Sequence, residues 1–247
     1  MPFLFGNIYL TYLVSGLILL VCIVISAWAS AKVHTTYRKY SKMRTSTDWT
    51  ASDAARMLLE RGGATEVGVA RGKGRLTDNF NPRTLTVSLS ESTYDSTSVA
   101  AVAVAAHEVG HVMQRKDDYF LYRLRGILVP VTNIGTMLAL PLVVVGIILE
   151  WVLATAEVGN VIVFIGVCLY GLSTLFTLVT LPVELNASRR AKAMLAETGV
   201  LVTKEERRAA SKVLSAAAMT YFASLLVSLL YFLRFLLYVL AFSRRDK

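Results

Sequence analysis

Four long apolar runs dominate the hydropathy pattern of the chain. They cover residues 8–31, 127–150, 160–182 and 216–242. A helix that crosses a bilayer needs about 20 mostly apolar residues, and each run reaches that length. The chain is 55% hydrophobic and only 17% charged, whereas soluble domains average roughly 25% charged residues. We therefore expect a mainly α, multi-pass integral membrane protein with about four transmembrane helices.

The water-facing block after the first run has shorter patterns. Residues 50–62 favour a capped helix that ends at a glycine pair, and residues 66–70 favour a short strand. A turn is expected at 79–82. Residues 84–89 alternate polar and apolar side chains, which predicts a half-exposed strand. An Ala/Val-rich helix is expected over 98–114. This block is therefore predicted to form a small α+β module.

These patterns divide the chain into five parts. In chain order they are a first transmembrane helix, the α+β module, a transmembrane hairpin, a polar helical segment, and a last membrane helix with a basic tail. Their residue ranges are 1–31, 32–126, 127–182, 183–217 and 218–247.

The net charge of +9 is unevenly distributed along the chain. Residues 1–31 and 126–182 contain no Lys or Arg, whereas residues 32–125 hold 15 and residues 183–217 hold 7 of the 26 cations. Such a bias is typical of loops on the cytosolic face of a membrane. We expect both basic stretches in the cytosol and the loop at 150–159 outside. The charge is thus explained by topology, and no nucleic-acid partner is expected.

The last apolar run fits this topology less well. Arg234 lies inside it, and a single crossing would place the basic tail of Arg244, Arg245 and Lys247 outside, against the positive-inside rule. A shallow or re-entrant final helix is therefore the competing interpretation.

One pentapeptide carries the chemistry. His107-Glu108-Val109-Gly110-His111 lies in the predicted Ala/Val-rich helix. Residues four apart share a helical face, so both imidazoles can bind one zinc ion. Glu108 would lie beside the metal, where it can accept a proton from the attacking water. The alternative is an amphipathic helix with two incidental histidines. The chain has only three histidines, and burying these charged groups without a metal would be costly. We therefore expect a metal site.

A catalytic zinc site needs a third protein ligand and an open position. His34 follows the first apolar run, where an interfacial role is expected, so a carboxylate is the better candidate. Asp117 and Asp118 are too close along the same helix to reach back, and Glu150 and Glu157 fall on the opposite side of the membrane. The remaining candidates are Glu184, Glu197, Glu205 and Glu206. Glu184 stands at the cytosolic end of the third run, where it can face the metal helix.

Three strings in this order resemble one known family. VAVAAHEVGHVMQ is preceded by LTDNFNPRTLTVSLS and followed by LPVELNASRRA. Together they resemble the YugP-like neutral zinc metallopeptidases, prokaryotic membrane proteins distantly similar to HtpX and CAAX-prenyl-protease type enzymes. The resemblance implies a zincin-like metalloprotease module, one Zn²⁺ per chain bound by His107 and His111, and Glu108 as catalytic base. By analogy with the HtpX type, Glu184 is the third ligand. Ser188 stands where that type has an Asp.

Further residues are expected to support the site or the substrate. Gln114, Asn186 and Ser188 are candidates for hydrogen bonds to the zinc ligands. The strand at 84–89 is predicted to be a sheet edge on which an extended substrate lies. Its residues are Thr84, Leu85, Thr86, Val87, Ser88 and Leu89.

The function expected from these features is zinc-dependent hydrolysis of peptide bonds at the cytosolic surface of a prokaryotic plasma membrane. The substrate would be a peptide or a membrane protein. An oligomer or a regulatory membrane partner is left open. One alternative is a site-2-type intramembrane protease, although the apolar run around the motif is too short to span a bilayer. The other is a zinc-binding scaffold without activity, which would have no need of Glu108.

Overall fold

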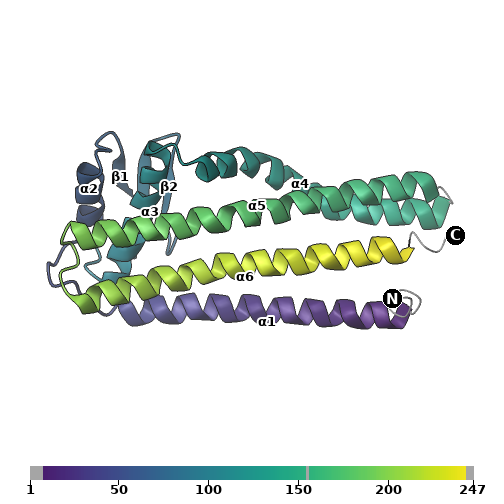
Figure 1. Ribbon diagram of the computed structural model, residues 1–247, viewed down its shortest axis with the longest axis horizontal. Coiled ribbons are helices and arrows are strands. Elements are labelled where there is room, and N and C mark those ends of the chain that lie inside the picture. Colours follow the sequence, from purple (N-terminus) through teal and green to yellow (C-terminus); the bar gives the residue numbers. More distant parts are fainter. Residues whose placement is uncertain (1–7, 154–155, 243–247) are drawn as a thin grey trace. The chain divides into compact units, whose positions relative to one another are not determined.

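The computed structural model describes residues 8–153 and 156–242 (Figure 1). Six helices and three short strands form within these residues. In chain order they are α1 (Ile8–Tyr40), α2 (Ala51–Arg61), β1 (Gly68–Arg71), β2 (Asn79–Asn81), β3 (Thr86–Leu89), α3 (Val99–Lys116), α4 (Phe120–Leu153), α5 (Ala156–Glu197) and α6 (Lys204–Phe242). The predicted mainly helical fold is thus confirmed.

Each of the four apolar runs lies on one long helix. The segments long and apolar enough to cross a membrane are Leu13–Tyr40, Phe120–Gly146, Val158–Glu197 and Lys204–Arg234. Large apolar side chains, mostly Leu, Ile, Val and Phe, are exposed along these segments, as expected for surfaces that face lipid. The prediction of four candidate transmembrane helices is confirmed.

One compact unit comprises the described parts of 1–28, 124–180 and 222–247. Within it, α4 and α5 run side by side (Figure 1). Small residues permit this contact, because a Cβ at Gly146 would lie 2.8 Å from the Gly159 carbonyl oxygen. The hydroxyls of Thr174 and Ser228 are 2.9 Å apart and join α5 to α6. The described residues of this unit form a helical bundle.

The final helix of this bundle is continuous. α6 has 39 residues without a break, which favours a single crossing over a re-entrant segment, since re-entry requires the helix to be interrupted. Arg234 donates to the Ser15 hydroxyl of α1 at 2.7 Å, so the cation in this run has a polar contact. The basic tail at 243–247 and residues 154–155 of the predicted outer loop lie outside the described residues.

The second compact unit comprises residues 29–123 and 181–221. Its core is formed by α2, the sheet, α3 and the adjoining ends of α5 and α6. α2 begins as predicted, because the Thr50 hydroxyl accepts from the Asp53 amide at 3.1 Å. α3 likewise begins after Ser98, whose hydroxyl accepts from the Ala101 amide. Both caps satisfy amides that have no partner inside the helix.

The three strands form one mixed sheet in the order β1-β3-β2. β1 pairs with β3 in parallel, with Val69 opposite Val87, and β2 pairs with β3 antiparallel, with Phe80 opposite Val87. Val87 and Leu89 are buried in the core. The predicted alternation therefore identifies the buried face of β3 correctly.

Three predictions about this sheet are wrong. β3 is the central strand and not an edge, and Thr84 and Leu85 belong to the preceding turn. Alternation reports which face of a strand is buried, but it does not reveal how many neighbours the strand has. The turn also does not lie at 79–82, because residues 79–81 form β2. It begins at Pro82, where the Asn81 side-chain oxygen accepts from the Arg83 amide at 2.9 Å.

Candidate active site

Helix α3 carries the HExxH motif through the core of the second unit. From Val99 to Gln114 nearly every residue is buried, including Glu108, His111 and Gln114. Alanine and valine predominate on this helix, which leaves little bulk between it and its neighbours. The polar residues of the motif are therefore presented inside a packed module rather than at a free surface.

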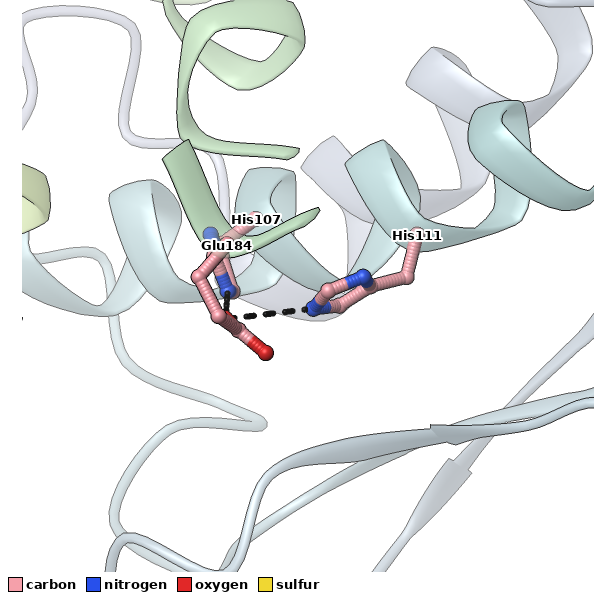
Figure 2. Close-up of side chains that lie close together, drawn as sticks. All are labelled: His107, His111 and Glu184. Atoms are coloured by element: carbon pink, nitrogen blue, oxygen red, sulfur yellow. Dashed lines mark hydrogen bonds and ion pairs between the residues drawn. The ribbon is translucent and has the colours of Figure 1, made fainter. Parts of the chain in front are cut away.

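The two histidines converge on a third polar residue from another helix. His107 Nε2 lies 3.1 Å, and His111 Nε2 3.5 Å, from the same oxygen of Glu184, Oε2 (Figure 2). Glu184 is 1% exposed, and its helix, α5, is remote from α3 in sequence. Among the described residues, these three form the group of ligating side chains suited to a metal, with donor atoms within 4.8 Å of one another.

A glycine in the motif permits this convergence. A Cβ at Gly110 would lie 2.5 Å from the carbonyl oxygen of Ala187 on α5. That separation is too short for any other residue, so the two helices can approach this closely only with glycine at position 110. Since Ala187 lies one turn after Glu184, this close approach holds the carboxylate against the imidazoles. The spacing of the motif gave no sign of this role.

Gln114 determines which nitrogen of His111 faces the metal position. The Gln114 Nε2 donates to the Val183 carbonyl at 2.7 Å and to the Asn186 Oδ1 at 3.0 Å. A carbonyl only accepts, so the Gln114 Oε1 must face His111 Nδ1, 2.9 Å away. His111 Nδ1 therefore carries the proton, and Nε2 is left free to bind a metal.

Ser188 has the equivalent position beside His107. Its hydroxyl lies 3.2 Å from His107 Nδ1 and can accept the proton on that nitrogen, so that Nε2 faces Glu184. A neutral hydroxyl can hold the imidazole in this orientation but adds no negative charge.

The hydrogen-bonded chain behind His111 continues to the surface. The Asn186 Oδ1 that accepts from Gln114 also accepts from Arg190 Nε at 2.9 Å, and Arg190 in turn pairs with Asp117 at the end of α3. Arg190 is therefore held in place by contacts with both Asn186 and Asp117.

Glu108 is buried beside the three-residue group. Burial raises the pKa of this carboxyl group to about 7, and the neighbouring carboxylates of Glu184 and Asp78 act in the same direction. His107 and a hydrogen bond from the Phe80 amide lower it again. A carboxyl with a pKa near neutrality can both accept and release a proton at physiological pH.

The remaining glutamates lie elsewhere. Glu197 and Glu205 are exposed. Glu206 is buried, and its carboxylate accepts from the amides of Ser46 and Thr203 at 2.5 and 2.8 Å. This carboxylate completes the cap of α6 and is thus committed to structure. The structure therefore brings only Glu184 of the four candidates to the histidines.

The donor set fits a zinc ion. Bonds of about 2.0–2.2 Å to tetrahedral zinc place neighbouring donor atoms roughly 3.4 Å apart. The two contacts of Glu184 Oε2, at 3.1 and 3.5 Å, bracket that separation. Two imidazoles and one carboxylate also match the ligand types of catalytic zinc sites, which leave a fourth position open.

Comparison with known proteins agrees with this geometry. Residues 15–240 match the family described as "Putative neutral zinc metallopeptidase". The chain belongs to this family. The chain is 39% identical over 214 residues to "Putative membrane protease YugP" of Bacillus subtilis (strain 168). The aligned residues cover 86% of this chain and 91% of the relative. No solved structure matches the chain significantly. Membership of a zinc metallopeptidase family and the His-His-Glu group together indicate zinc as the metal.

Three features of this family member were absent from the sequence predictions. They are the close approach at Gly110, the Phe80 amide that contacts Glu108, and the ring of Tyr122, whose centroid lies 6.1 Å from that of His111. Only Gly110 carried a usable signal, since a glycine inside a helix lowers its stability unless packing requires it.

Replacing Gly110 with alanine should separate α3 from α5. The added methyl group would overlap a backbone carbonyl, so we expect a loss of roughly 1–3 kcal/mol in stability and weaker zinc binding although every ligand is retained. Thermal unfolding and zinc titration measure both effects. Gly126→Ala on α4 is the matched control, because a Cβ there meets nothing within 4 Å. Equal zinc affinity in Gly110→Ala and wild type would contradict this account.

Replacing Gln114 with alanine should weaken zinc binding by about 10–100-fold, because His111 loses the group that fixes its orientation. Competition against a chelator of known affinity provides the measurement. Glu197→Ala, an exposed change on α5, serves as control and should bind zinc normally. Unchanged affinity in Gln114→Ala would show that packing alone orients the imidazole.

Proposed function

We propose that this protein is a zinc metalloendopeptidase that hydrolyses peptide bonds, with His107, His111 and Glu184 as ligands and Glu108 as general base. The observation that carries the proposal is the convergence of both His Nε2 atoms on one buried Glu184 oxygen, 3.1 and 3.5 Å away. Such a cluster has little stability without a cation at its centre. The name of the relative, a membrane protease, supports the same class of reaction.

The two glutamates have different tasks in this proposal. Zinc, when bound, polarises the scissile carbonyl and makes water a better nucleophile at neutral pH. Glu184 supplies a negative oxygen that partly balances the charge of the dication. Glu108 accepts a proton from the attacking water at its carboxylate and delivers it to the amine that leaves. Its raised pKa, about 7, suits a group that must take up and release a proton in each cycle.

β2 forms one of the two edges of the sheet, and β1 forms the other. Among the described strands, β2 pairs with β3 alone, and the Phe80 amide on its other side donates to Glu108. This edge thus borders the general base. We propose that a substrate binds there in extended conformation through backbone hydrogen bonds, which tolerate varied side chains. β3, with partners on both sides, cannot serve in this way.

The site is further proposed to face the cytosol, as part of a zincin-like module. The support is the bias of Lys and Arg toward the two segments that build the second unit, whose described residues form the module around α3. A prokaryotic plasma membrane is the proposed location. The intramembrane alternative has less support, because α3 has 18 residues and is not among the four candidate spans.

Two variants separate binding from catalysis. Glu108→Gln should keep about one zinc per chain yet lower turnover by about 10²–10⁴-fold, since an amide cannot shuttle the proton. Glu184→Ala should lower both zinc affinity and activity. Each loss should exceed the roughly 10–100-fold that is typical when a residue that only supports a metal ligand is replaced. Zinc content and cleavage of an unstructured peptide are measured on the same samples.

Glu197→Ala, which removes an exposed carboxylate of α5, is the control for both variants. Retained turnover in Glu108→Gln would refute the general base. Stoichiometric zinc with normal turnover in Glu184→Ala would refute the third ligand. Zinc binding without cleavage of any peptide in the wild type would favour the scaffold alternative.

If the substrate binds along the edge of β2, its backbone hydrogen bonds should be visible in the KM values of modified peptides. Peptides with a single N-methylated amide should show a raised KM where that amide would donate to β2, and a normal KM at neighbouring positions, because hydrogen-bonding groups alternate along an extended chain. A scan through one cleaved peptide tests this. A uniform KM across all positions would contradict binding along the edge.

The topology is tested by cysteine labelling in intact cells, in a background without Cys22 and Cys168. A membrane-impermeant reagent should label Glu157→Cys before lysis and Lys73→Cys only afterwards, since the proposal places 150–159 outside and the module inside. The reverse pattern would place the site on the outer face.

A further inference from the structure

A second polar site lies in the same unit and shares no residue with the metal site. It is a pocket of about 540 Å³ between the end of α1 and the first turns of α6. Its lining consists mainly of cationic side chains, with one tyrosine and one carboxylate: Lys39, Tyr40, Lys204, Glu205, Arg208, Ala209 and Lys212.

The cations of this pocket have no acidic partners. Among the described residues, no ion pair or hydrogen bond is formed by Lys39, Lys204, Arg208 or Lys212, and Lys39 contacts only the ring of Tyr40, 5.5 Å from its centroid. Five other cations among the described residues of this unit form ion pairs, as Arg44 does with Asp48 and Arg123 with Asp118. What distinguishes the pocket is that four cations without an ion pair line one cavity. The pocket therefore gathers four cations against a single carboxylate, that of Glu205.

The spacing of these cations is unfavourable without a ligand. Lys204, Arg208 and Lys212 are four residues apart and share one face of α6, and like charges at this spacing destabilise a helix. Lys39 faces the same pocket from α1. An anion between the two helices would relieve the repulsion at all four positions.

The pocket has a fixed framework. On the buried face of α6, Glu206 binds the amide and hydroxyl of Ser46 at 2.5 and 2.8 Å and closes the helix cap with Thr203. These bonds hold the first turn of α6 in place, so the cations project from a rigid element. A ligand binds more tightly to a rigid site, because less conformational freedom is lost on binding.

We propose that this pocket binds the phosphate group of an anionic ligand. The phosphate can belong to the headgroup of an anionic phospholipid or to a soluble phosphate. The headgroup has access, because Lys212 precedes the apolar run of α6 by four residues, about 6 Å along the helix. Each Lys or Arg near an anionic headgroup strengthens binding by about fivefold, so removal of three should weaken it by about 100-fold.

The test compares two triple variants of the full chain in detergent. K204Q/R208Q/K212Q removes the cations of α6. R61Q/K73Q/R75Q removes the same charge from exposed positions of the same unit. Native mass spectrometry measures retention of phosphatidylglycerol against phosphatidylcholine, and thermal unfolding measures stabilisation by inorganic phosphate against chloride at equal ionic strength. K204R/K212R should behave as wild type, because it keeps the charge.

Wild type should retain phosphatidylglycerol selectively or gain stability with phosphate, and the pocket variant should lose that response while the control keeps it. A response to the lipid alone assigns the headgroup as ligand, and a response to phosphate alone assigns a soluble anion. Two results would overturn the proposal. One is the absence of any response of the wild type to either probe. This result is measured on the wild type alone and so does not depend on whether a variant folds. The other is an equal loss in both triple variants, which would show attraction by net charge alone.

Discussion

The contact between α3 and α5 at Gly110 and Ala187 is the constraint on which the site depends. A Cβ at position 110 would lie 2.5 Å from the Ala187 carbonyl oxygen, so no side chain separates the two helices. This approach brings Glu184, from the distant helix, to two imidazoles on α3. Burying two imidazoles and a carboxylate in a packed interior costs free energy unless a cation binds between them. A bound metal ion would therefore complete the charge balance of this site.

Around this contact, hydrogen bonds assign a role to each polar group. Gln114 and Ser188 hold the Nδ1 atoms of the histidines, at 2.9 and 3.2 Å, and both Nε2 atoms consequently face Glu184. Glu108, only one residue from His107, is kept apart from the ligand set and has a pKa raised by burial to about 7. Two carboxylates in one site can therefore divide the work of ligand and proton carrier because their surroundings differ.

Local patterns in the sequence were sufficient to predict much of the fold and part of the site. The helical period places His107 and His111 on one face, apolar length identifies four candidate membrane helices, and the cap at Thr50 locates the start of α2. Contacts between distant segments were beyond such patterns. β2 has three residues with asparagine at both ends, so it carries no strand signal, and the error about the sheet edge follows from its omission. The basic pocket likewise joins segments more than 160 residues apart.

X-ray absorption at the zinc edge of the purified, zinc-loaded protein tests whether His107, His111 and Glu184 bind the metal. We expect a first coordination shell of nitrogen and oxygen at about 2.0–2.2 Å with scattering from two imidazoles. A sulfur ligand near 2.3 Å, or a single imidazole, would place the metal elsewhere and contradict the assignment.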